Sequence, residues 1–540
     1  MKYKVCILAA GIGSRMKPFT EHINKSLLPV NFKAVISHII EKFDTNIEIV
    51  VAVGHLKETV IDYLDCAHKD RKFTIVEVDR FTGKGSGPGY SLMQCRDHLN
   101  LPFVFFASDT LVLEDIPPPI ENWLGVSPVI ETKEYCTAKI VSNMIVGLDD
   151  KIVSDNENAF VGVAGVRDYK IFFEALSRDT ELKDNELQVS NGFSALMDYD
   201  LRPNYFTWYD TGNINGYSNA NKKMSKLDCA FDFSKSDEFL YFVGNKVIKY
   251  FKDKLIIKNR YTRSKILHGL CPKIICIKDS FYTYDKVGGK VLYDTINDQV
   301  MHDFIHWIDK NLWINVKISN SQRKIFKSAC LDFYYKKTLS RIDKYQKKHQ
   351  IKDQSTNING VKVPSIEKML SLIDWDYMST GIASNFHGDL QFDNILLKEN
   401  NDFLILDWRQ DFSGIIDFGD QYYDLAKLNG GMKVSYKLIK QNKFSFHKDS
   451  QGDITIDHEP PPELNRARKI FKNYLNNKNL IYFGSRNHPL SNVKKKLTRE
   501  IIGIIFKIII RIFYNISISD TQCGFKLYKS VTAKKIFEKI

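Results

Sequence analysis

An apolar run near the N-terminus leads directly into a loop of glycine and other small residues. The run covers residues 5–8 (VCIL), the loop covers residues 9–14 (AAGIGS), and the cations Arg15 and Lys25 follow. A short, continuous apolar run that ends in a glycine-containing loop predicts a buried parallel strand. Small residues let backbone N–H groups approach an anion closely, and the two cations add positive charge. The segment therefore predicts a cradle for a triphosphate.

Length and composition indicate a multidomain protein of the ordinary globular kind. A chain of 540 residues is too long for one hydrophobic core, and its 44% hydrophobic and 26% charged residues suit soluble domains. The net charge of +13 suits anionic partners, although a lysine-rich surface explains most of it. No stretch interleaves aromatic and basic residues in the manner of a nucleic-acid module, so we expect no nucleic-acid partner.

Cysteine usage and the first residues bear on the compartment. Nine cysteines, an odd number without a close metal-ligand cluster, favour a reducing compartment. Cys271 and Cys276 are the nearest pair, but they have no second pair nearby and do not predict a zinc site. The start of the chain lacks the apolar length and cleavage site of a secretory signal. We therefore expect a mature N-terminus and a cytoplasmic protein.

Apolar strand runs alternate with helical patterns in the first part of the chain. The strand runs lie at 47–53, 73–78 and 103–107, and a helical pattern lies at 35–43. This βαβ rhythm predicts an α/β fold with a parallel sheet. A polar stretch at 219–236 then precedes two apolar runs at 239–243 and 247–251, which predict a β-hairpin.

We therefore expect three parts, at residues 1–235, 237–476 and 480–540. The three prolines at 460–462 predict a rigid bend within the second part. The third part is too short to be a complete enzyme.

The stretch LAAGIGSRMKPFTEHINKSLLPV at 8–30 resembles the sugar-phosphate nucleotidylyltransferase superfamily, which includes choline-phosphate cytidylyltransferases. The resemblance spans roughly the first 230 residues, and its many fixed positions make it more specific than a lone glycine motif. It implies a Rossmann-like domain in which Arg15 contacts the departing pyrophosphate and Lys25 the phosphate of the incoming substrate. It also implies that the nucleoside triphosphate is held by Ala10, Gly11, Gly13 and Ser14.

Two aspartates match the metal-binding carboxylates of that superfamily. Asp109 directly follows the strand run at 103–108, and Asp210 lies in WYDTG at 208–212. In-line attack on the α-phosphorus needs no protein nucleophile but concentrates negative charge, which Mg²⁺ on two carboxylates would offset. A helix N-cap for Asp109 and a turn carboxylate for Asp210 stay open as structural alternatives. The glycine-rich loop at 83–89 either approaches the base or substrate or is a plain connector.

A second motif, NFHGDLQFDN at 385–394, is followed by a strand run at 403–406 and then Asp407. It resembles the aminoglycoside phosphotransferase and choline kinase superfamily, whose fold is that of protein kinases, over roughly residues 237–476. The resemblance implies that Asp389 is the catalytic base, that Asn394 and Asp407 bind Mg²⁺, and that His387 holds the backbone of the loop.

The same resemblance reaches upstream and downstream of this motif. Lys249 fits the strand lysine that grips the ATP phosphates, residues 281–289 fit the strand and hinge of the adenine pocket, and Asp424 fits a structural carboxylate. Two departures are evident: only Asp253 is acidic between residues 251 and 278, so the usual helix glutamate has no counterpart, and no glycine follows Asp407 directly. A kinase fold that does not phosphorylate is therefore a serious alternative.

The C-terminal part resembles the second half of dolichyl- and polyprenyl-phosphate glycosyltransferases. The resemblance rests on residues 483–486 and 519–527, where Asp520 would match an active-site residue. Between them, residues 501–518 are rich in isoleucine but contain Lys507 and Arg511. Charges in mid-segment argue against a membrane span and permit either peripheral membrane contact or a helix packed on another domain.

Together these features predict an α/β, Rossmann-like nucleotidyltransferase domain, a protein-kinase-like α+β domain and a short partial C-terminal segment. We expect a bifunctional enzyme in which ATP phosphorylates a hydroxylated precursor. A nucleoside triphosphate such as CTP or UTP then activates the phosphorylated sugar or amino alcohol for surface glycan synthesis. Consecutive steps on one chain raise the local concentration of the intermediate. The alternative is a nucleotidyltransferase with a non-catalytic, nucleotide-binding kinase-like scaffold.

Overall fold

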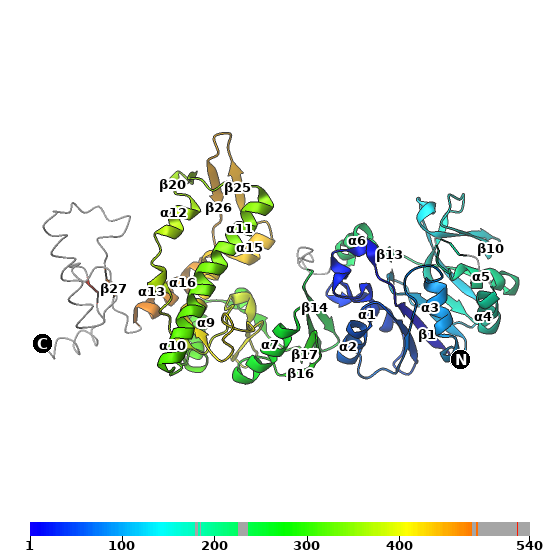
Figure 1. Cartoon of the computed structure of the whole chain (residues 1–540), viewed down its shortest axis with the longest axis horizontal. Coiled ribbons are helices and arrows are strands. Elements are labelled where there is room, and N and C mark those ends of the chain that lie inside the picture. Colours follow the sequence, from blue (N-terminus) through cyan, green and yellow to red (C-terminus); the bar gives the residue numbers. More distant parts are fainter. Residues whose placement is uncertain (179–181, 184, 225–235, 478–481, 484–525, 528–540) are drawn as a thin grey trace. The chain divides into compact units, whose positions relative to one another are not determined.

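The computed structural model describes residues 1–178, 182–183, 185–224, 236–477, 482–483 and 526–527. The chain forms two compact units (Figure 1). Unit 1 comprises Met1–Tyr261 and Lys273–Lys286, and unit 2 comprises Thr262–Pro272 and Val287–Ile540. Of the C-terminal features that the sequence singles out, Asp520 and residues 501–518 lie outside the described residues.

The large sheet of unit 1 is parallel in one half and antiparallel in the other. The parallel half has the order β6-β1-β4-β5 and consists of β1 (Lys4–Ala9), β4 (Ile49–Val53), β5 (Phe73–Glu77) and β6 (Phe103–Ala107). Beyond β6 the strands run largely antiparallel and comprise β8 (Trp123–Pro128), β9 (Cys136–Val141), β10 (Met144–Asp150), β11 (Asn158–Val166) and β12 (Arg202–Tyr205). The expected parallel sheet is thus correct for the first four strands only, and the whole sheet is mixed.

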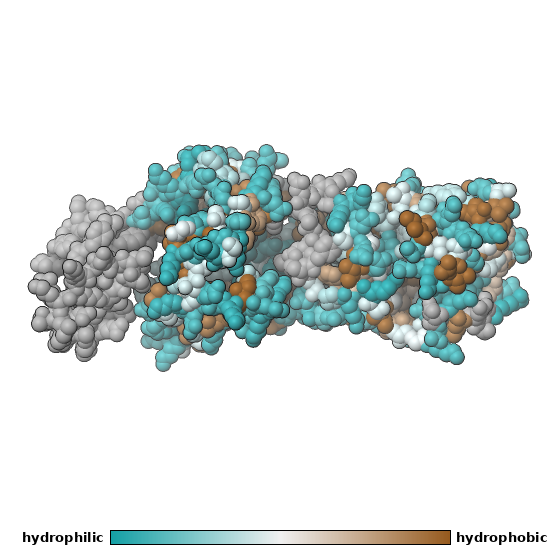
Figure 2. Space-filling view, turned by 90° about the horizontal axis from the view of Figure 1, so that it is seen from above, coloured by the Kyte–Doolittle hydropathy of each residue, from teal (hydrophilic) through white to brown (hydrophobic). Residues whose placement is uncertain are grey.

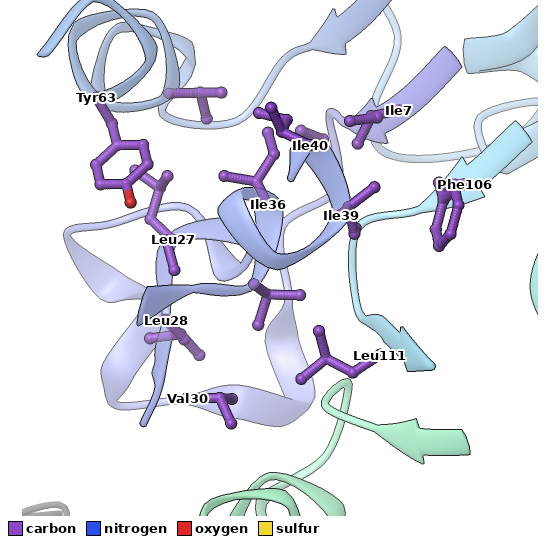
Figure 3. Packing of buried hydrophobic residues seen from close by; sticks show 14 of the residues in the cluster. Ile7, Leu27, Leu28, Val30, Ile36, Ile39, Ile40, Tyr63, Phe106 and Leu111 are labelled. Carbon is purple, nitrogen blue, oxygen red and sulfur yellow. The ribbon is translucent and has the colours of Figure 1, made fainter. Parts of the chain in front are cut away.

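Helices cover both faces of this sheet because its central strands are apolar on both sides. Ile7 and Val51 belong to the core beneath α1 (Val35–Ile40), α2 (Lys57–Ala67) and α6 (Ile214–Met224). Cys6 and Val50 belong to the opposite core, beneath α3 (Pro88–Gln94), α4 (Tyr169–Arg178) and α5 (Ser190–Leu196). Figure 3 shows Ile36, Ile39 and Ile40 of α1 within the first of these cores. This is the arrangement expected of an α/β domain.

Short elements complete this part of unit 1. They are the strands β2 (Pro29–Val30), β3 (Lys33–Ala34), β7 (Thr110–Val112) and β13 (Trp208–Asp210), with 3₁₀ turns at Ser14–Met16, Phe19–Glu21, Lys25–Leu27, Arg96–His98, Thr132–Glu134 and Met197–Tyr199.

A four-stranded antiparallel sheet also belongs to unit 1. It has the order β14-β15-β17-β16, with β14 (Glu238–Val243), β15 (Lys246–Phe251), β16 (Ile274–Ile277) and β17 (Phe281–Asp285). The expected hairpin at 239–251 is correct. One face of this sheet joins the α1 core, so the compact unit extends past the expected boundary near residue 236. At this contact, Cys276 Sγ of β16 lies 3.2 Å from Cys66 Sγ of α2.

Unit 2 is mainly helical. The chain enters it through α7 (Lys254–Ile266), and its other helices are α8 (Leu292–Thr295), α9 (Asp298–Asn311), α10 (Asn320–Leu331), α11 (Lys337–His349), α12 (Ile366–Ser371), α13 (Trp375–Met378), α14 (Gln421–Lys433), α15 (Tyr436–Lys440) and α16 (Pro462–Asn477). A π-helical turn at Asp332–Lys336 joins α10 to α11. The prolines at 460–462 end where α16 begins, which suits proline at a first helical position.

Small sheets complete unit 2. They consist of β18 (Lys290–Val291) with β22 (Ile395–Leu397) and β23 (Phe403–Ile405), of β19 (Thr356–Ile358), β20 (Val361–Val363), β25 (Ser445–Lys448) and β26 (Ile454–Asp457), and of β21 (Ala383–Ser384) with β24 (Gly419–Asp420). The pair β27 (Tyr482–Phe483) and β28 (Lys526–Leu527) follows.

The surface of the described residues is mostly hydrophilic on the face in Figure 2, with hydrophobic side chains in separate small patches. No helix in the described part of the chain combines the length and the apolarity that crossing a membrane requires.

Candidate active site

The glycine-rich loop after β1 is anchored by a buried asparagine. Asn24 is fully buried, and its Nδ2 donates to the carbonyl oxygens of Ala9 at 2.9 Å and His55 at 2.8 Å. Gly13 has a φ of 67°, and a Cβ there would lie 3.0 Å from Cβ of Lys25. A glycine is needed at this position because the backbone is left-handed and the Lys25 side chain passes close by.

Four predicted site residues converge at Gly212. A Cβ on Gly212 would lie 2.8 Å from Oδ2 of Asp109, 3.0 Å from Oδ1 of Asp210 and 3.3 Å from Nη2 of Arg15. Lys25 Nζ in turn forms an ion pair of 2.6 Å with Oδ2 of Asp109. Two carboxylates and two cations thus form one cluster, and a side chain at position 212 would collide with it.

Strand pairing brings the two aspartates together. β7 and β13 are antiparallel, and their register places Thr110 opposite Asp210. Thr211 reinforces the pairing, because its N–H and its hydroxyl both donate to the carbonyl oxygen of Asp109, at 2.9 Å and 2.8 Å. Asp210 accepts from the N–H of Gly212 at 2.7 Å and from Nδ2 of Asn213 at 2.7 Å. The pair therefore has a defined geometry although about a hundred residues separate its members.

The pKa values of the two carboxyls move in opposite directions. Burial raises the pKa of Asp109, but the ion pair with Lys25 and the nearby Arg15 outweigh it, so the pKa of Asp109 lies below its usual value. Burial, followed by the negative charge of Asp109, raises the pKa of Asp210. A bound cation would relieve the repulsion between the two carboxylates.

The donor set fits Mg²⁺, which prefers oxygen ligands and commonly takes one or two carboxylates together with phosphate oxygens and water. The described residues contain no group of three or more histidine, cysteine, aspartate or glutamate side chains suited to a metal, so the two aspartates would be the protein's share of the ligands. Both aspartates line the small cavity described below, which is where such an ion would lie.

Two pockets meet at these residues. The first, here called the glycine-loop pocket, has a volume of about 780 Å³ and is lined by residues of the 10–15 loop, Lys25, Asp109 and the 81–88 loop. The second, here called the aromatic pocket, has a volume of about 830 Å³ and is lined by Tyr135, Trp208, Asp210 and neighbours. Arg15 and Lys151 line both pockets. Asp109 and Asp210 also share the lining of a smaller cavity of about 220 Å³.

Sequence reasoning missed Lys151, Tyr135 and Trp208. Lys151 follows β10 with a left-handed φ of 54°, and Tyr135 precedes β9, so neither belongs to a recognisable motif. The ring of Tyr135 meets that of Trp208 edge-to-face with centroids 5.2 Å apart. Trp208 lies two residues before Asp210, and this closeness to a predicted site residue could have indicated that Trp208 lines the site. The 83–89 loop, left open between connector and binding loop, does line the glycine-loop pocket.

A second set of predicted residues converges in unit 2, on the loop between β21 and β22. Asn394 Nδ2 donates to the carbonyl oxygen of Asp389 at 2.8 Å. Asp424 on α14 accepts from the N–H groups of His387 at 2.6 Å and Gly388 at 2.7 Å, although burial raises its pKa to about 6. The loop is therefore held from both sides by side chains that the kinase resemblance singles out.

Asp407 follows β23 next to this loop. The N–H of Leu406 donates to the carbonyl oxygen of Asn394 at 2.8 Å, which places the following residue, Asp407, beside Asn394. Asp407 has a left-handed φ of 58°, a conformation that is uncommon outside glycine. Sequence reasoning missed Lys427, whose Nζ lies 2.8 Å from Oδ1 of Asp389 and which stands one helical turn after Asp424.

Lys249 lies on β15 in unit 1, whereas Asp389, Asn394 and Asp407 lie in unit 2. Only 8% of its surface is exposed, and it pairs in register with Leu240 and Tyr282. The next helix, α7, contains no acidic residue and so offers no glutamate of the kind the kinase resemblance leads one to expect.

Acid is expected to destabilise the Asp389 loop through His387. Burial, the largest cause, lowers the pKa of this fully buried imidazole to about 4. Its Nε2 donates to the carbonyl oxygen of Leu406 at 2.7 Å, and its Nδ1 accepts from the N–H of Asp389 at 3.2 Å. A second proton would bind to Nδ1 and would then point at the N–H of Asp389, which is itself a donor. Between pH 6.5 and 4 the imidazole is protonated in the unfolded chain but neutral in the folded protein. The free energy of unfolding therefore falls as pH falls.

The measurement is the pH dependence of the thermal midpoint of the full chain, compared with His387→Gln. The glutamine can keep both hydrogen bonds but does not titrate. From pH 7 to 5 the wild-type midpoint should fall by roughly 5 °C more than that of the variant. The raised pKa of Asp424 acts in the opposite direction, but Asp424 is present in both proteins and cancels in the comparison. Equal pH slopes would contradict the assignment.

Comparison with known proteins relates part of the chain to characterised enzymes. No family model matches. The chain is 25% identical over 233 residues to the bifunctional protein GlmU of Methanococcus vannielii. The aligned stretch covers 41% of this chain and 54% of that protein. The chain therefore spans about half the length of this relative.

Two further relatives match shorter stretches. The UTP–glucose-1-phosphate uridylyltransferase AglF of Haloferax volcanii is 28% identical over 107 residues, or 19% of this chain and 42% of AglF. The choline-phosphate cytidylyltransferase of Streptococcus pneumoniae is 46% identical over 63 residues, or 11% of this chain and 27% of that enzyme.

Solved structures give similar matches. CTP:phosphocholine cytidylyltransferase of Streptococcus pneumoniae has a TM-score of 0.35 and 19% identity, covering 42% of this chain and all of that chain. UDP-glucose pyrophosphorylase of Acinetobacter baumannii has a TM-score of 0.36 and 16% identity, covering 42% of this chain and 96% of that chain. On the sequence matches, the N-terminal part of this chain is homologous to nucleotidyltransferases of the GlmU, glucose-1-phosphate uridylyltransferase and choline-phosphate cytidylyltransferase kinds.

Proposed function

We propose that the N-terminal part of the chain transfers a nucleoside monophosphate from a nucleoside triphosphate to a phosphorylated acceptor and releases pyrophosphate. The observation that carries the proposal is the convergence of Arg15, Lys25, Asp109 and Asp210 on the border between two pockets. The homology of this part to enzymes of the same reaction class supports it.

The two pockets suit the two substrates. In this assignment the glycine-loop pocket holds the triphosphate, because backbone N–H groups and Arg15 line it. The aromatic pocket holds the acceptor, whose phosphate reaches the α-phosphorus at the shared border. Lys25 and Arg15 offset the charge that builds up there, and no side chain needs to act as a nucleophile. Mg²⁺ on Asp109 and Asp210, when bound, would polarise the α-phosphate.

The lining of the aromatic pocket favours a phosphorylated amino alcohol over a phosphorylated sugar. Tyr135 and Trp208 present aromatic surfaces there, and Glu131 and Glu134 line the same pocket. Three cations, Arg15, Lys133 and Lys151, line it too and suit the phosphate of the acceptor. Aromatic faces together with carboxylates attract an ammonium group, by contact with the ring quadrupole and by charge. A sugar hydroxyl gains less from this combination.

Trp208→Leu is therefore expected to raise KM for choline phosphate by about tenfold, because the cation loses an aromatic face. KM for the nucleoside triphosphate should stay within about twofold, since Trp208 does not line the glycine-loop pocket. Steady-state pyrophosphate release with each substrate varied in turn measures both constants. Tyr205→Leu, an exposed aromatic outside the pocket, is the control. Better turnover of glucose 1-phosphate than of choline phosphate by the wild type would reverse the choice of acceptor.

For the second part of the chain we propose an ATP-dependent phosphotransferase that makes the phosphorylated acceptor. The observation that favours it is the loop in which Asp389, Asn394 and Asp407 lie together, braced by Asp424. Asp389 would accept the proton of the substrate hydroxyl, and Asn394 and Asp407 would hold Mg²⁺. The role of Lys249 in binding the ATP phosphates stays a prediction. The competing proposal is a nucleotide-binding scaffold without phosphotransfer, for which the absence of an acidic residue from α7 is the best support.

One screen tests both parts. The full chain is incubated with Mg²⁺, with ATP and either CTP or UTP, and with a panel of sugars and amino alcohols, while ADP and pyrophosphate are followed separately. ADP and pyrophosphate from the same unphosphorylated acceptor would support consecutive steps in the supply of an activated precursor for surface glycans. Pyrophosphate that forms only with phosphorylated acceptors, without ADP from any compound, would favour the scaffold. A cytoplasmic location stays a prediction.

A further inference from the structure

The segment that carries Lys25 is held by tyrosines from the sheet that follows the α/β domain. Tyr241 on β14 donates its hydroxyl to the carbonyl oxygen of Leu27 at 2.9 Å. Tyr250 on β15 donates to the carbonyl oxygen of His22 at 2.7 Å. These two carbonyls flank Lys25 on either side along the chain. Residues 22–29 are called the Lys25 segment below.

The α/β domain also holds this segment. Inside it, Asn24 Nδ2 donates to the carbonyl oxygens of Ala9 at 2.9 Å and His55 at 2.8 Å. Tyr217 on α6 donates to the carbonyl oxygen of Pro29 at 2.8 Å. The bonds from Tyr241 and Tyr250 come from residues that the kinase resemblance assigns to a different domain. The sheet β14–β17 therefore helps to hold the Lys25 segment in place.

The contact between this sheet and the α/β core is extensive and mostly apolar. Phe239, Tyr241, Val243, Ile248, Tyr250 and Phe281 form one continuous buried core with Leu27, Leu28 and Tyr63. Tyr63 on α2 packs edge-to-face on Tyr241 with ring centroids 5.0 Å apart. At the rim, Lys278 pairs with Asp65 at 2.6 Å. Interiors of this kind are close-packed and transmit small displacements.

Strand β15 presents different residues to its two sides. Successive side chains of a strand point to opposite faces, so Lys249 and Tyr250 face opposite sides of the sheet. Tyr250 is 1% exposed and belongs to the shared core, whereas Lys249 is absent from that core. A single strand thus carries both a residue predicted to bind ATP and a residue that holds the Lys25 segment.

We propose that Tyr241 and Tyr250 are positioning residues for nucleotidyl transfer: their hydroxyls fix the Lys25 segment so that Lys25 meets Asp109. The inference rests on the proposed function of the N-terminal part. It means that β14 and β15 help to complete the nucleotidyl-transfer site, although the motifs of that activity all lie before residue 213. This dependence supplies a physical reason for the two parts to share one chain.

The test is hydroxyl removal in the full-length protein. Tyr241→Phe and Tyr250→Phe should each lower kcat for pyrophosphate release by about tenfold, since small misplacements of a catalytic group are costly. The matched control is Tyr63→Phe. Tyr63 is equally buried and touches the same sheet, but its hydroxyl bonds Ser37 at 2.7 Å and not the Lys25 segment. It should lower the thermal midpoint by a similar amount and leave kcat within about twofold.

A double-mutant cycle separates positioning from general destabilisation. In a Lys25→Arg background, Tyr241→Phe should cost clearly less than it does in the wild type, because the group that it positions has already been changed. Equal costs in both backgrounds, or a kcat loss in Tyr63→Phe matching that in Tyr241→Phe, would overturn the inference. Inactivity of the wild type with every acceptor would instead contradict the proposed function, so the two failures are distinguishable.

Discussion

Replacing Asp109 by asparagine is expected to lower nucleotidyl transfer by about 10²–10³-fold in kcat. Asp109 is the carboxylate that pairs with Lys25, and it lines the same small cavity as Asp210. Asparagine keeps the shape but removes the charge that would bind a cation and orient the Lys25 ammonium. Pyrophosphate release with CTP or UTP and a phosphorylated acceptor measures the effect, and the loss should appear in kcat more than in KM.

Asp115→Asn is the matched control for this change. Asp115 is exposed and lies six residues along the chain, beyond β7 and outside the lining of the three pockets that contain Arg15. Its activity should equal that of the wild type. If Asp109→Asn also kept wild-type activity, the assignment of Asp109 as a metal-binding carboxylate would be wrong, whatever the fate of the nucleotidyltransferase proposal.

Replacing Asp389 by asparagine should abolish ADP formation and leave pyrophosphate release from a ready-made phosphorylated acceptor unchanged. Loss of a general base costs about 10²–10⁴-fold, and asparagine cannot accept the proton of a substrate hydroxyl. Asp389 keeps Asn394 within 2.8 Å through its backbone carbonyl, so the substitution leaves that hydrogen bond in place. Following both products in the same reaction checks the two halves of this expectation.

Asp402→Asn is a close control, because Asp402 pairs with Lys398 at 2.7 Å much as Asp389 pairs with Lys427 at 2.8 Å. It lies on the turn between β22 and β23, away from the Asp389 loop. The Asp402→Asn variant should form ADP at the wild-type rate. ADP formation that survives Asp389→Asn would refute the base assignment, and a wild type that forms no ADP with any acceptor would leave the scaffold as the better description.

The local elements of the first domain follow from sequence pattern. The apolar runs at 49–53, 73–77 and 103–107 are strands, because continuous apolar residues suit strands covered on both faces. The antiparallel half of the sheet was not foreseen. Its strands β9 and β10 contain exposed and half-buried positions and lack the continuous apolar run that identifies a central strand.

The predicted site residues were chosen from motifs, but their geometry depends on pairing between distant segments. Asp109 and Asp210 meet because β7 pairs with β13, a contact between residues about a hundred positions apart that no local pattern encodes. Lys151 and Tyr135 reach the same place from irregular segments, where no periodicity signals a role. The assignment of roles to these residues stays a prediction that the variants above test.

By itself, the sequence of this protein determined the strand–glycine loop–cation segment, the two aspartate motifs and the motif at 385–394, because each depends on residues close together in the chain. The tertiary structure alone decided that the sheet at 238–285 packs into the α/β core and holds the Lys25 segment. The apolar residues of these strands indicate a buried hairpin, but their pattern does not indicate which part of the protein buries it. Burial selects a partner by shape and by the hydrogen bonds it can satisfy, and both exist only once the chain has folded.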